Sequence, residues 1–262
     1  STGNVTILNS APTASLVSPE NGNITTNRTP EFSWSGNDLD SDSLQYELNI
    51  TRVFTTVNCL DSDRYVTKET LLGNTTYSPT SDYLKCLWDN GDWYNWSARV
   101  YDGEEYSSWS SFRNISIQSS IVISLPTDSI NFGSLGLGES NDTTDGSPAP
   151  IILRNDGNAL TNVSANFTNL WNSSIGAIPS DYYRYKVTNV TGNCFVYENS
   201  TTSLTQAHIT TNAIIQKLNF SQSYHTACSN TSIDVAITVP SDEQNGSKSS
   251  TIIFTGSLGE KY

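Results

Sequence analysis

Asn-x-Ser/Thr triplets carry the clearest chemistry in this 262-residue chain, because each one is an acceptor for an N-linked glycan on an exported protein. Sixteen triplets are present, and none has proline in the middle position. The 27 asparagines and the 70 serines and threonines predict about seven such triplets by chance, so the sequence has about twice the expected number. The predicted glycosylation sites are Asn4, Asn23, Asn27, Asn49, Asn74, Asn95, Asn114, Asn141, Asn162, Asn166, Asn172, Asn189, Asn199, Asn219, Asn230 and Asn245.

Strand periodicity indicates on which side of a sheet several of these asparagines lie. Successive side chains of a strand point to opposite faces, and a glycan needs the wet face. Asn49, Asn95, Asn162, Asn166 and Asn219 each alternate with apolar neighbours in segments that favour strands. We therefore expect all five to face outward. The alternative is that the triplets are accidents of a composition rich in asparagine, serine and threonine.

Four cysteines, Cys59, Cys86, Cys194 and Cys228, allow three pairings in an exported protein. Only the pairs Cys59–Cys86 and Cys194–Cys228 keep each bridge within one predicted domain, so we predict these two disulfides. In the chain-entropy model each would stabilise its domain by about 3–4 kcal/mol. Metal binding is the alternative use, but the sequence has no Cys-x-x-Cys motif and only two histidines.

Three carboxylates at alternate positions, Asp38, Asp40 and Asp42, have a spacing that can surround a Ca²⁺ ion if a loop supplies further oxygens. The stretch resembles the Asp-x-Asp-x-Asp-x-Leu-x-Tyr segment of cadherin-like bacterial modules, and that resemblance implies a structural calcium ion. The alternative is a solvated turn before the strand that starts near residue 44. The glycine and distal glutamate of an EF-hand loop are missing here.

Aromatic residues in segment 87–94, including Trp88 and Trp93, stand beside polar groups in the manner of a sugar-stacking platform. Packing of these rings around Cys86 explains the pattern equally well. His208 and His225 have no nucleophile, Gly-x-Ser-x-Gly, His-Glu-x-x-His or paired-acid motif to accompany them. We expect no catalytic residues, no enzyme activity and no cofactor other than calcium and the glycans.

The composition excludes several classes of partner. The formal net charge of −13 repels phosphate backbones, so we expect no nucleic-acid binding. No apolar run approaches 18 residues, so we expect no membrane insertion. The chain begins at Ser1 and has no methionine, which favours an exported form after signal-peptide removal. We therefore expect an extracellular or cell-surface location.

The pattern of elements is all-β, with two tandem sandwich domains of immunoglobulin or fibronectin type III-like architecture. The first domain spans 12–118, where turn signals such as those at 19–22 and 102–103 separate short strands. Its expected strands are 14–17, 31–35, 44–53, 94–101 and 111–117. Segments 16–22, 29–34, 46–48, 94–103 and 108–110 resemble the fibronectin type III family in its microbial surface form. That resemblance implies a spacing and adhesion module with no catalytic residue.

The second domain spans 119–262 and shows no sustained helical period. Its expected strands are 121–125, 130–132, 150–154, 163–170, 182–190, 207–211, 214–220, 233–239 and 251–254. The run Asn155-Asp156-Gly157-Asn158 predicts a hairpin between two of them. Segments 132–139 and 153–158 resemble sandwich domains of archaeal surface proteins and of biofilm filament subunits.

Residues 1–11 precede the first domain and contain a short alternating strand, in which Val5 and Ile7 would face inward. Such a segment could add a strand to a sheet edge of a neighbouring copy. We therefore expect a glycosylated structural subunit of an extracellular filament or surface layer, assembled by non-covalent contacts with copies of itself. The alternative is a monomeric adhesin or carbohydrate-binding module that binds surface glycans of other cells.

Overall fold

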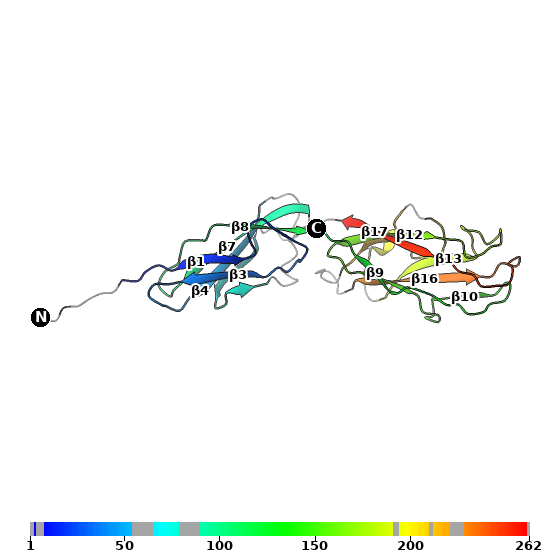
Figure 1. Ribbon diagram of the computed structural model, residues 1–262, viewed down its shortest axis with the longest axis horizontal. Coiled ribbons are helices and arrows are strands. Elements are labelled where there is room, and N and C mark those ends of the chain that lie inside the picture. Colours follow the sequence, from blue (N-terminus) through cyan, green and yellow to red (C-terminus); the bar gives the residue numbers. More distant parts are fainter. Residues whose placement is uncertain are drawn as a thin grey trace. The chain divides into compact units, whose positions relative to one another are not determined.

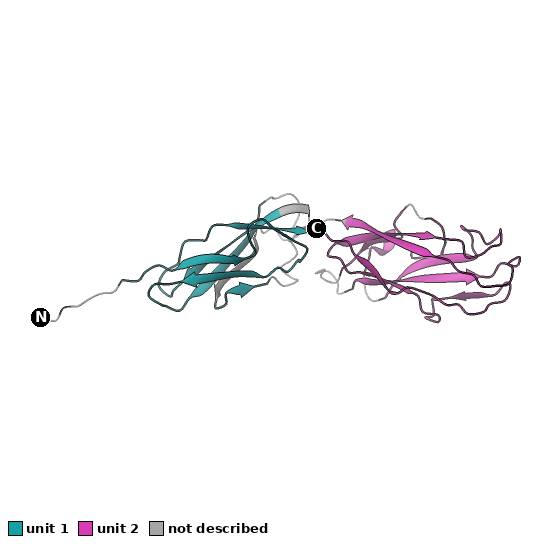
Figure 2. Ribbon diagram, viewed as in Figure 1, with its two compact units in different colours: residues 1–119, 262 teal, residues 120–261 magenta. Residues whose placement is uncertain are grey.

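The computed structural model describes residues 3, 8–53, 65–78, 90–190, 194–209, 212–220 and 228–260, with the backbone alone at 52, 65–72, 90–92 and 260. The chain divides into two compact units, one ending at Ser119 and the other beginning at Ser120 (Figure 2). We call them unit 1 and unit 2. Both are built from strands, and the described residues contain no α-helix (Figure 1).

Unit 1 is formed by two sheets. The three-stranded sheet has the order β1-β3-β6, and the five-stranded sheet has the order β2-β8-β7-β4-β5. The strands are β1 (Thr13–Ser18), β2 (Asn23–Thr25), β3 (Phe32–Asn37), β4 (Gln45–Arg52), β5 (Tyr65–Leu72), β6 (Thr76–Tyr77), β7 (Asn90–Tyr101) and β8 (Arg113–Gln118). All neighbours pair antiparallel except β2 and β8, which run parallel.

The core of unit 1 lies between the inner faces of these sheets. It contains Phe32, Trp34, Tyr46, Leu48, Ile50, Tyr94, Trp96, Ala98, Val100, Ile115 and Ile117. The alternation in β4 and β7 follows the sequence prediction, because every second residue is buried. Phe32 and Trp96 meet edge to face across the two sheets, with ring centroids 5.2 Å apart. Aromatic pairs of this geometry stabilise a core beyond their buried area.

Unit 2 is also a pair of sheets. One has the order β14-β13-β16-β11-β9, with β10 pairing β16 in addition, and the other has the order β15-β12-β17. The strands are β9 (Ile123–Thr127), β10 (Ser140–Asp142), β11 (Ile151–Asn155), β12 (Leu160–Phe167), β13 (Tyr183–Asn189), β14 (Thr205–Gln206), β15 (Ile215–Leu218), β16 (Asn230–Thr238) and β17 (Ile252–Glu260), and a 3-10 turn, η2, covers Tyr197–Asn199. β9 and β17 lie at the ends of their sheets.

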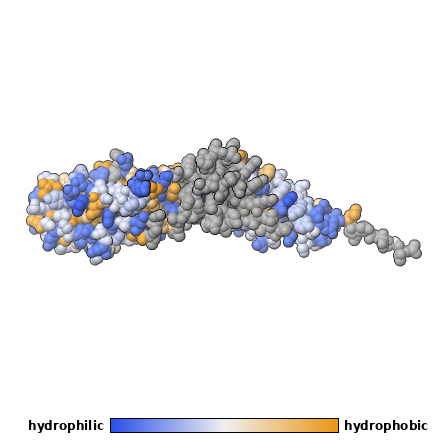
Figure 3. All heavy atoms as spheres, turned by 180° about the vertical axis from the view of Figure 1, so that it is seen from behind, coloured by the Kyte–Doolittle hydropathy of each residue, from blue (hydrophilic) through white to orange (hydrophobic). Residues whose placement is uncertain are grey.

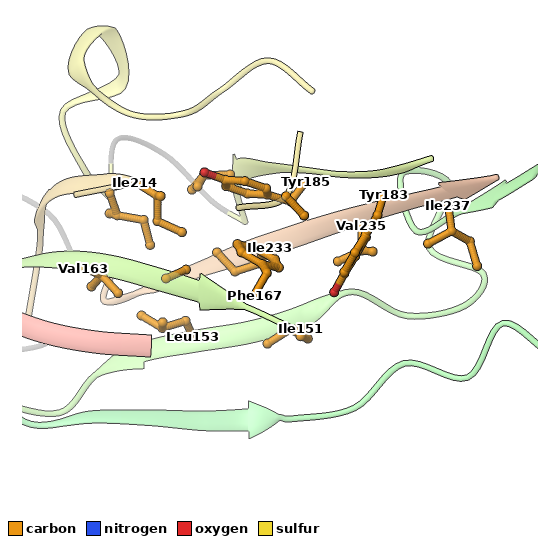
Figure 4. Close-up of a cluster of buried hydrophobic side chains, with 14 of the residues drawn as sticks. Ile151, Leu153, Val163, Phe167, Tyr183, Tyr185, Ile214, Ile233, Val235 and Ile237 are labelled. Atoms are coloured by element: carbon orange, nitrogen blue, oxygen red, sulfur yellow. The ribbon is translucent and has the colours of Figure 1, made fainter. Parts of the chain in front are cut away.

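The core of unit 2 is aliphatic with a tyrosine and phenylalanine cluster at its centre. Figure 4 shows side chains of β11, β13 and β16 meeting those of β12. Phe167 packs against both Tyr183 and Tyr185, with centroids 5.7 and 4.6 Å apart. Cys194 and Cys228 form the predicted disulfide, with their Cα atoms 5.3 Å apart. Cys59 and Cys86 lie outside the described residues.

Two expected strands of unit 2 are wrong. Residues 130–132 form no strand, although Ile130 and Phe132 still pack against the core. Residues 207–211 form none within their described part, and β14 ends just before them at Gln206. Apolar residues that touch a core from an extended segment carry the same sequence signal as a short strand, so periodicity alone cannot separate the two.

The predicted hairpin at residues 155–158 is also wrong. β11 belongs to one sheet and β12 to the other, so this turn carries the chain across the sandwich. Asn155 is fully buried, and its Nδ2 donates to the carbonyl oxygens of Ala159 (2.8 Å) and Leu218 (3.0 Å). A Cβ on Gly157 would lie 2.1 Å from the carbonyl oxygen of Ser120, so this close crossing requires glycine.

Candidate functional site

Unit 2 contains a groove with a volume of about 1110 Å³. It exceeds the roughly 300–1,000 Å³ of ordinary small-molecule pockets. Two segments that lie outside the strands form its sides. The first rim is residues 128–137, which follow β9, and the second rim is residues 243–251, which precede β17.

The floor of the groove is the apolar interior of the sandwich. β16 and the residue after it contribute Val235, Ile237 and Val239, and β13 contributes Tyr183. Figure 4 shows Tyr183, Val235 and Ile237 together at this end of the core. Burial raises the pKa of the Tyr183 hydroxyl, while a hydrogen bond with Ser250 of the second rim acts in the opposite direction. A segment inserted between the rims would therefore meet apolar side chains.

The rims themselves leave backbone groups unpaired. Among the described residues, the main chain of 245–250 has no hydrogen-bond partner within the protein. Along 128–135 the main chain makes one such bond, from Gly133 N–H to Asn131 Oδ1 (2.9 Å). Unpaired main-chain donors and acceptors on extended segments are what an added strand can bind. No sequence signal marks this groove, because its residues come from five strands and the loops that join them.

Glu243 fixes the second rim to the body of unit 2. One of its carboxylate oxygens accepts hydrogen bonds from the N–H groups of Asn172 and Ser173, both at 2.9 Å. The other lies 2.5 Å from Lys248 Nζ. The hydrogen bond from Lys248 lowers the pKa of the Glu243 carboxyl, and the two backbone N–H groups lower it further. Lys248 therefore links the middle of the rim to a buried acid.

The N-terminal segment is attached to unit 1 at Asn9 and Ser10. Asn9 Nδ2 donates to Asp102 Oδ2 (2.9 Å), and Ser10 N–H donates to Asp40 Oδ2 (2.6 Å). The side chain of Leu8 is 80% exposed. The predicted assembly residues Val5 and Ile7 lie outside the described residues, as does Asn4. The attachment points were missed by sequence reasoning, because nothing local marks a contact 93 residues away.

Of the sixteen sequon asparagines, fifteen lie in the described part of the chain. Asn23, Asn27, Asn74, Asn166, Asn172, Asn199 and Asn245 are exposed, and Asn49, Asn95, Asn114, Asn141, Asn162, Asn189 and Asn230 are half-buried. The predicted outward orientation is confirmed for Asn49, Asn95, Asn162 and Asn166, because the residues on either side of each are buried. Glycan attachment at any of these positions stays a prediction.

Asn219 contradicts its predicted orientation. Its side chain is 6% exposed, and its Oδ1 accepts a hydrogen bond from the N–H of Phe220 (3.0 Å). The cause is Lys217, whose φ of +53° is left-handed and interrupts the strand alternation. Leu218, Asn219 and Phe220 are consequently buried in succession.

The proposed calcium ligands do not converge. Asp38 Oδ2 accepts from the N–H groups of Asp40 (3.0 Å) and Asp42 (2.9 Å), which is a local turn. Asp40 instead holds Ser10. Within the described residues, no three His, Cys, Asp or Glu side chains are grouped closely enough to hold a metal ion. Calcium binding stays a prediction without structural support here.

The remaining candidates are divided between described and undescribed residues. Trp93 is half-buried on β7, whereas Trp88 and His225 lie outside the described residues. His208 Nδ1 lies 2.7 Å from the carbonyl oxygen of Gln206, two residues away. No helix in the described part of the chain has the length and apolar character to cross a bilayer.

No protein-family model and no curated protein matches this sequence. Solved structures with some likeness include an α-L-rhamnosidase from Dictyoglumus thermophilum (10% identity, TM-score 0.28, covering 97% of this chain and 28% of that one). The FN1–FN3 domains of chicken CNTN1 match with 10% identity and a TM-score of 0.27, covering 94% of this chain and 67% of that one. An α-L-rhamnosidase from Aspergillus terreus matches with 10% identity and a TM-score of 0.24, covering 95% of this chain and 28% of that one. This chain thus spans little more than a quarter of the rhamnosidases. Similarity this low assigns no family or activity, and the all-β architecture rests on the strands described above.

Proposed function

We propose that this chain is an N-glycosylated structural subunit of an extracellular filament, in which the N-terminal segment of one copy fills the groove of the next. The observation that carries the proposal is the groove, whose apolar floor lies between two rims with unpaired main-chain groups. An added strand would satisfy those groups, and its alternate side chains would enter the apolar floor. Assembly of this kind is a structural role that needs no catalysis.

The N-terminal segment has the composition that such a strand needs. Val5 and Ile7 are apolar at alternate positions, and Thr6 between them is polar. The segment is fixed to unit 1 at Asn9 and Ser10, so a strand leaving this point stays joined to a folded domain. Because the donor belongs to one end of the chain and the groove to unit 2, the contact is heterologous, and heterologous contacts form open fibres unless the rotation closes them.

Electron microscopy of native material combined with position-specific cross-linking tests this proposal. A photoreactive amino acid in place of Ile7 is expected to cross-link to residues 128–137 or 243–251 of a second copy within fibres. The same photoreactive residue in place of Leu39, which is 81% exposed in unit 1, serves as the control and is expected to give no groove adduct. Dispersed particles, or fibres without groove adducts from position 7, would overturn the proposal.

A monomeric adhesin that binds carbohydrate is the second candidate function. The exposed rings of Tyr106, Trp109 and Phe112 in unit 1 favour it, because sugars bind on exposed aromatic faces. A glycan array probed with native monomer distinguishes the two functions. Glycan binding that is lost in Trp109→Ala would support the adhesin. Fibre formation without binding to any glycan on the array would support the structural subunit.

A further inference from the structure

The outward face of β7 and β8 in unit 1 bears a line of aromatic side chains with two sequons within it. On β7, Trp93, Asn95 and Arg99 point away from the core, because the residues between them are buried. On the side of β8, Phe112 is 60% exposed. We call Trp93, Phe112, Trp109 and Tyr106 the aromatic stripe. On the face drawn in Figure 3, hydrophobic residues reach the surface as separate patches among polar ones.

One end of the aromatic stripe is held rigidly. The Arg99 guanidinium lies 4.1 Å from the ring centroid of Tyr106 and 4.8 Å from that of Trp109, and its Nε lies 2.5 Å from Glu47 Oε2. The segment that carries these two rings is bonded to β7 through Ser107, whose Oγ accepts a hydrogen bond from Val100 N–H (2.9 Å). Stacking on this ion-paired arginine covers one face of each of these two rings.

Asn95 and Asn114 lie directly opposite each other at the centre of the stripe. Asn114 N–H donates to Asn21 Oδ1 (2.8 Å), and its carbonyl accepts from Gly22 N–H (2.9 Å), so both groups point away from β7. The two asparagines are therefore a non-hydrogen-bonded pair, for which the Cα atoms are about 4.5 Å apart. Two glycans attached here start side by side.

Each of these asparagines has an aromatic residue two positions before it. Trp93 shares the outward face of β7 with Asn95, and Phe112, which comes just before β8, is 60% exposed. Trp93 precedes Asn95 and is paired across the strands with Ser116, and Phe112 precedes Asn114. In the described part of the chain, neither asparagine side chain makes a hydrogen bond, so the amide nitrogen that accepts a glycan is not bonded to protein in either one. Trp93 and Phe112 also make no stacking contact with another ring among the described residues.

We propose that the glycans of Asn95 and Asn114 diverge along the strands and that their first sugar rings stack on Trp93 and Phe112. Two chains that start about 4.5 Å apart cannot occupy the same space, so they must lean in opposite directions. An aromatic ring stands on each side of the pair, and a sugar's C–H face covers such a ring. The inference rests on the proposed glycosylation, and it makes this part of the stripe an intramolecular sugar-binding site.

Hydroxyl-radical footprinting of the native glycoprotein tests the inference, with intact glycopeptide mass spectrometry to record occupancy. Labelling of Trp93 and Phe112 is expected to rise several-fold when both glycans are removed by Asn95→Gln together with Asn114→Gln. The single variants show which glycan covers which ring. Leu39 is an internal standard, since its 81% exposed side chain should be labelled equally in all samples. Asn74→Gln, in the turn before β6, is the matched control and should leave both rings protected.

Three results would overturn the inference. If both glycans are present and removing them leaves the labelling of both rings unchanged, the sugars do not stack there. If one asparagine is never occupied, the divergent pair does not exist. If neither position carries a glycan, the inference fails together with glycosylation at these two sites. The filament proposal is judged separately, by microscopy and cross-linking from position 7.

Discussion

Asn155 illustrates how a single side chain determines the path of the chain. Sequence reasoning assigned its neighbourhood to a hairpin, because Asn-Asp-Gly-Asn between two strands is the usual signal for one. The buried amide instead bonds main-chain groups of the crossing segment and of β15, so β11 and β12 enter different sheets. A turn motif predicts that the chain reverses, but the partners of its side chains decide which sheet it enters.

Replacing this residue should be costly. Asn155→Ala leaves the buried carbonyls of Ala159 and Leu218 without their amide donor, so unit 2 should lose about 2–4 kcal/mol of unfolding free energy. Chemical denaturation of the variant and the parent chain measures the difference. Asn131→Ala is the control, since Asn131 is exposed and makes one bond, to Gly133. Its expected cost is below about 1 kcal/mol, and equal losses in both variants would contradict the explanation.

At the scale of elements, strand alternation was the reliable part of the sequence signal. It located the buried faces of β4, β7 and β12 because these strands are regular. It failed at Asn219, where a left-handed residue changes the phase, and at residues 130–132, which touch the core without pairing. The groove could not be predicted, because its two rims are 106 residues or more apart in sequence and neither is periodic.

The stability of the second rim should depend on pH through the Glu243 carboxyl group. Its pKa is lowered in the folded chain, so its contribution to stability is present above its ordinary value of 4.5 and is lost as the pH falls through the lowered pKa. Hydrogen exchange at the Asn172 and Ser173 N–H groups, which donate to Glu243, should therefore quicken in that acidic range, after correction for the intrinsic pH dependence. Glu243→Gln should remove the dependence, whereas Asp242→Asn, its exposed neighbour, should keep it. An unchanged profile in Glu243→Gln would show that the rim is held by other contacts.

For the molecule as a whole, charge opposes self-association. Each copy carries a formal charge of −13, so copies repel one another before any contact forms. Salt shortens the Debye length from about 30 Å at 0.01 M to about 8 Å at 0.15 M, which screens that repulsion. We therefore expect fibres to form faster as NaCl is raised over this range, with EDTA present throughout. Light scattering gives the rate, and slower assembly in higher salt would mean that opposite charges drive the contact.

The buried Asn219 can report whether the chain folds before or after sugar transfer during export. In the folded chain its side chain is enclosed and hydrogen-bonded, so a glycosyltransferase could reach it only on a chain that has not yet folded. If folding is faster than sugar transfer, Asn219 stays unglycosylated while the exposed Asn166 is glycosylated. If transfer is faster than folding, both asparagines are glycosylated. In the chains glycosylated at Asn219, β15 should then fail to pack against the core. Glycopeptide occupancy at Asn219 and Asn166 therefore compares the rate of folding with the rate of glycan transfer in the living cell.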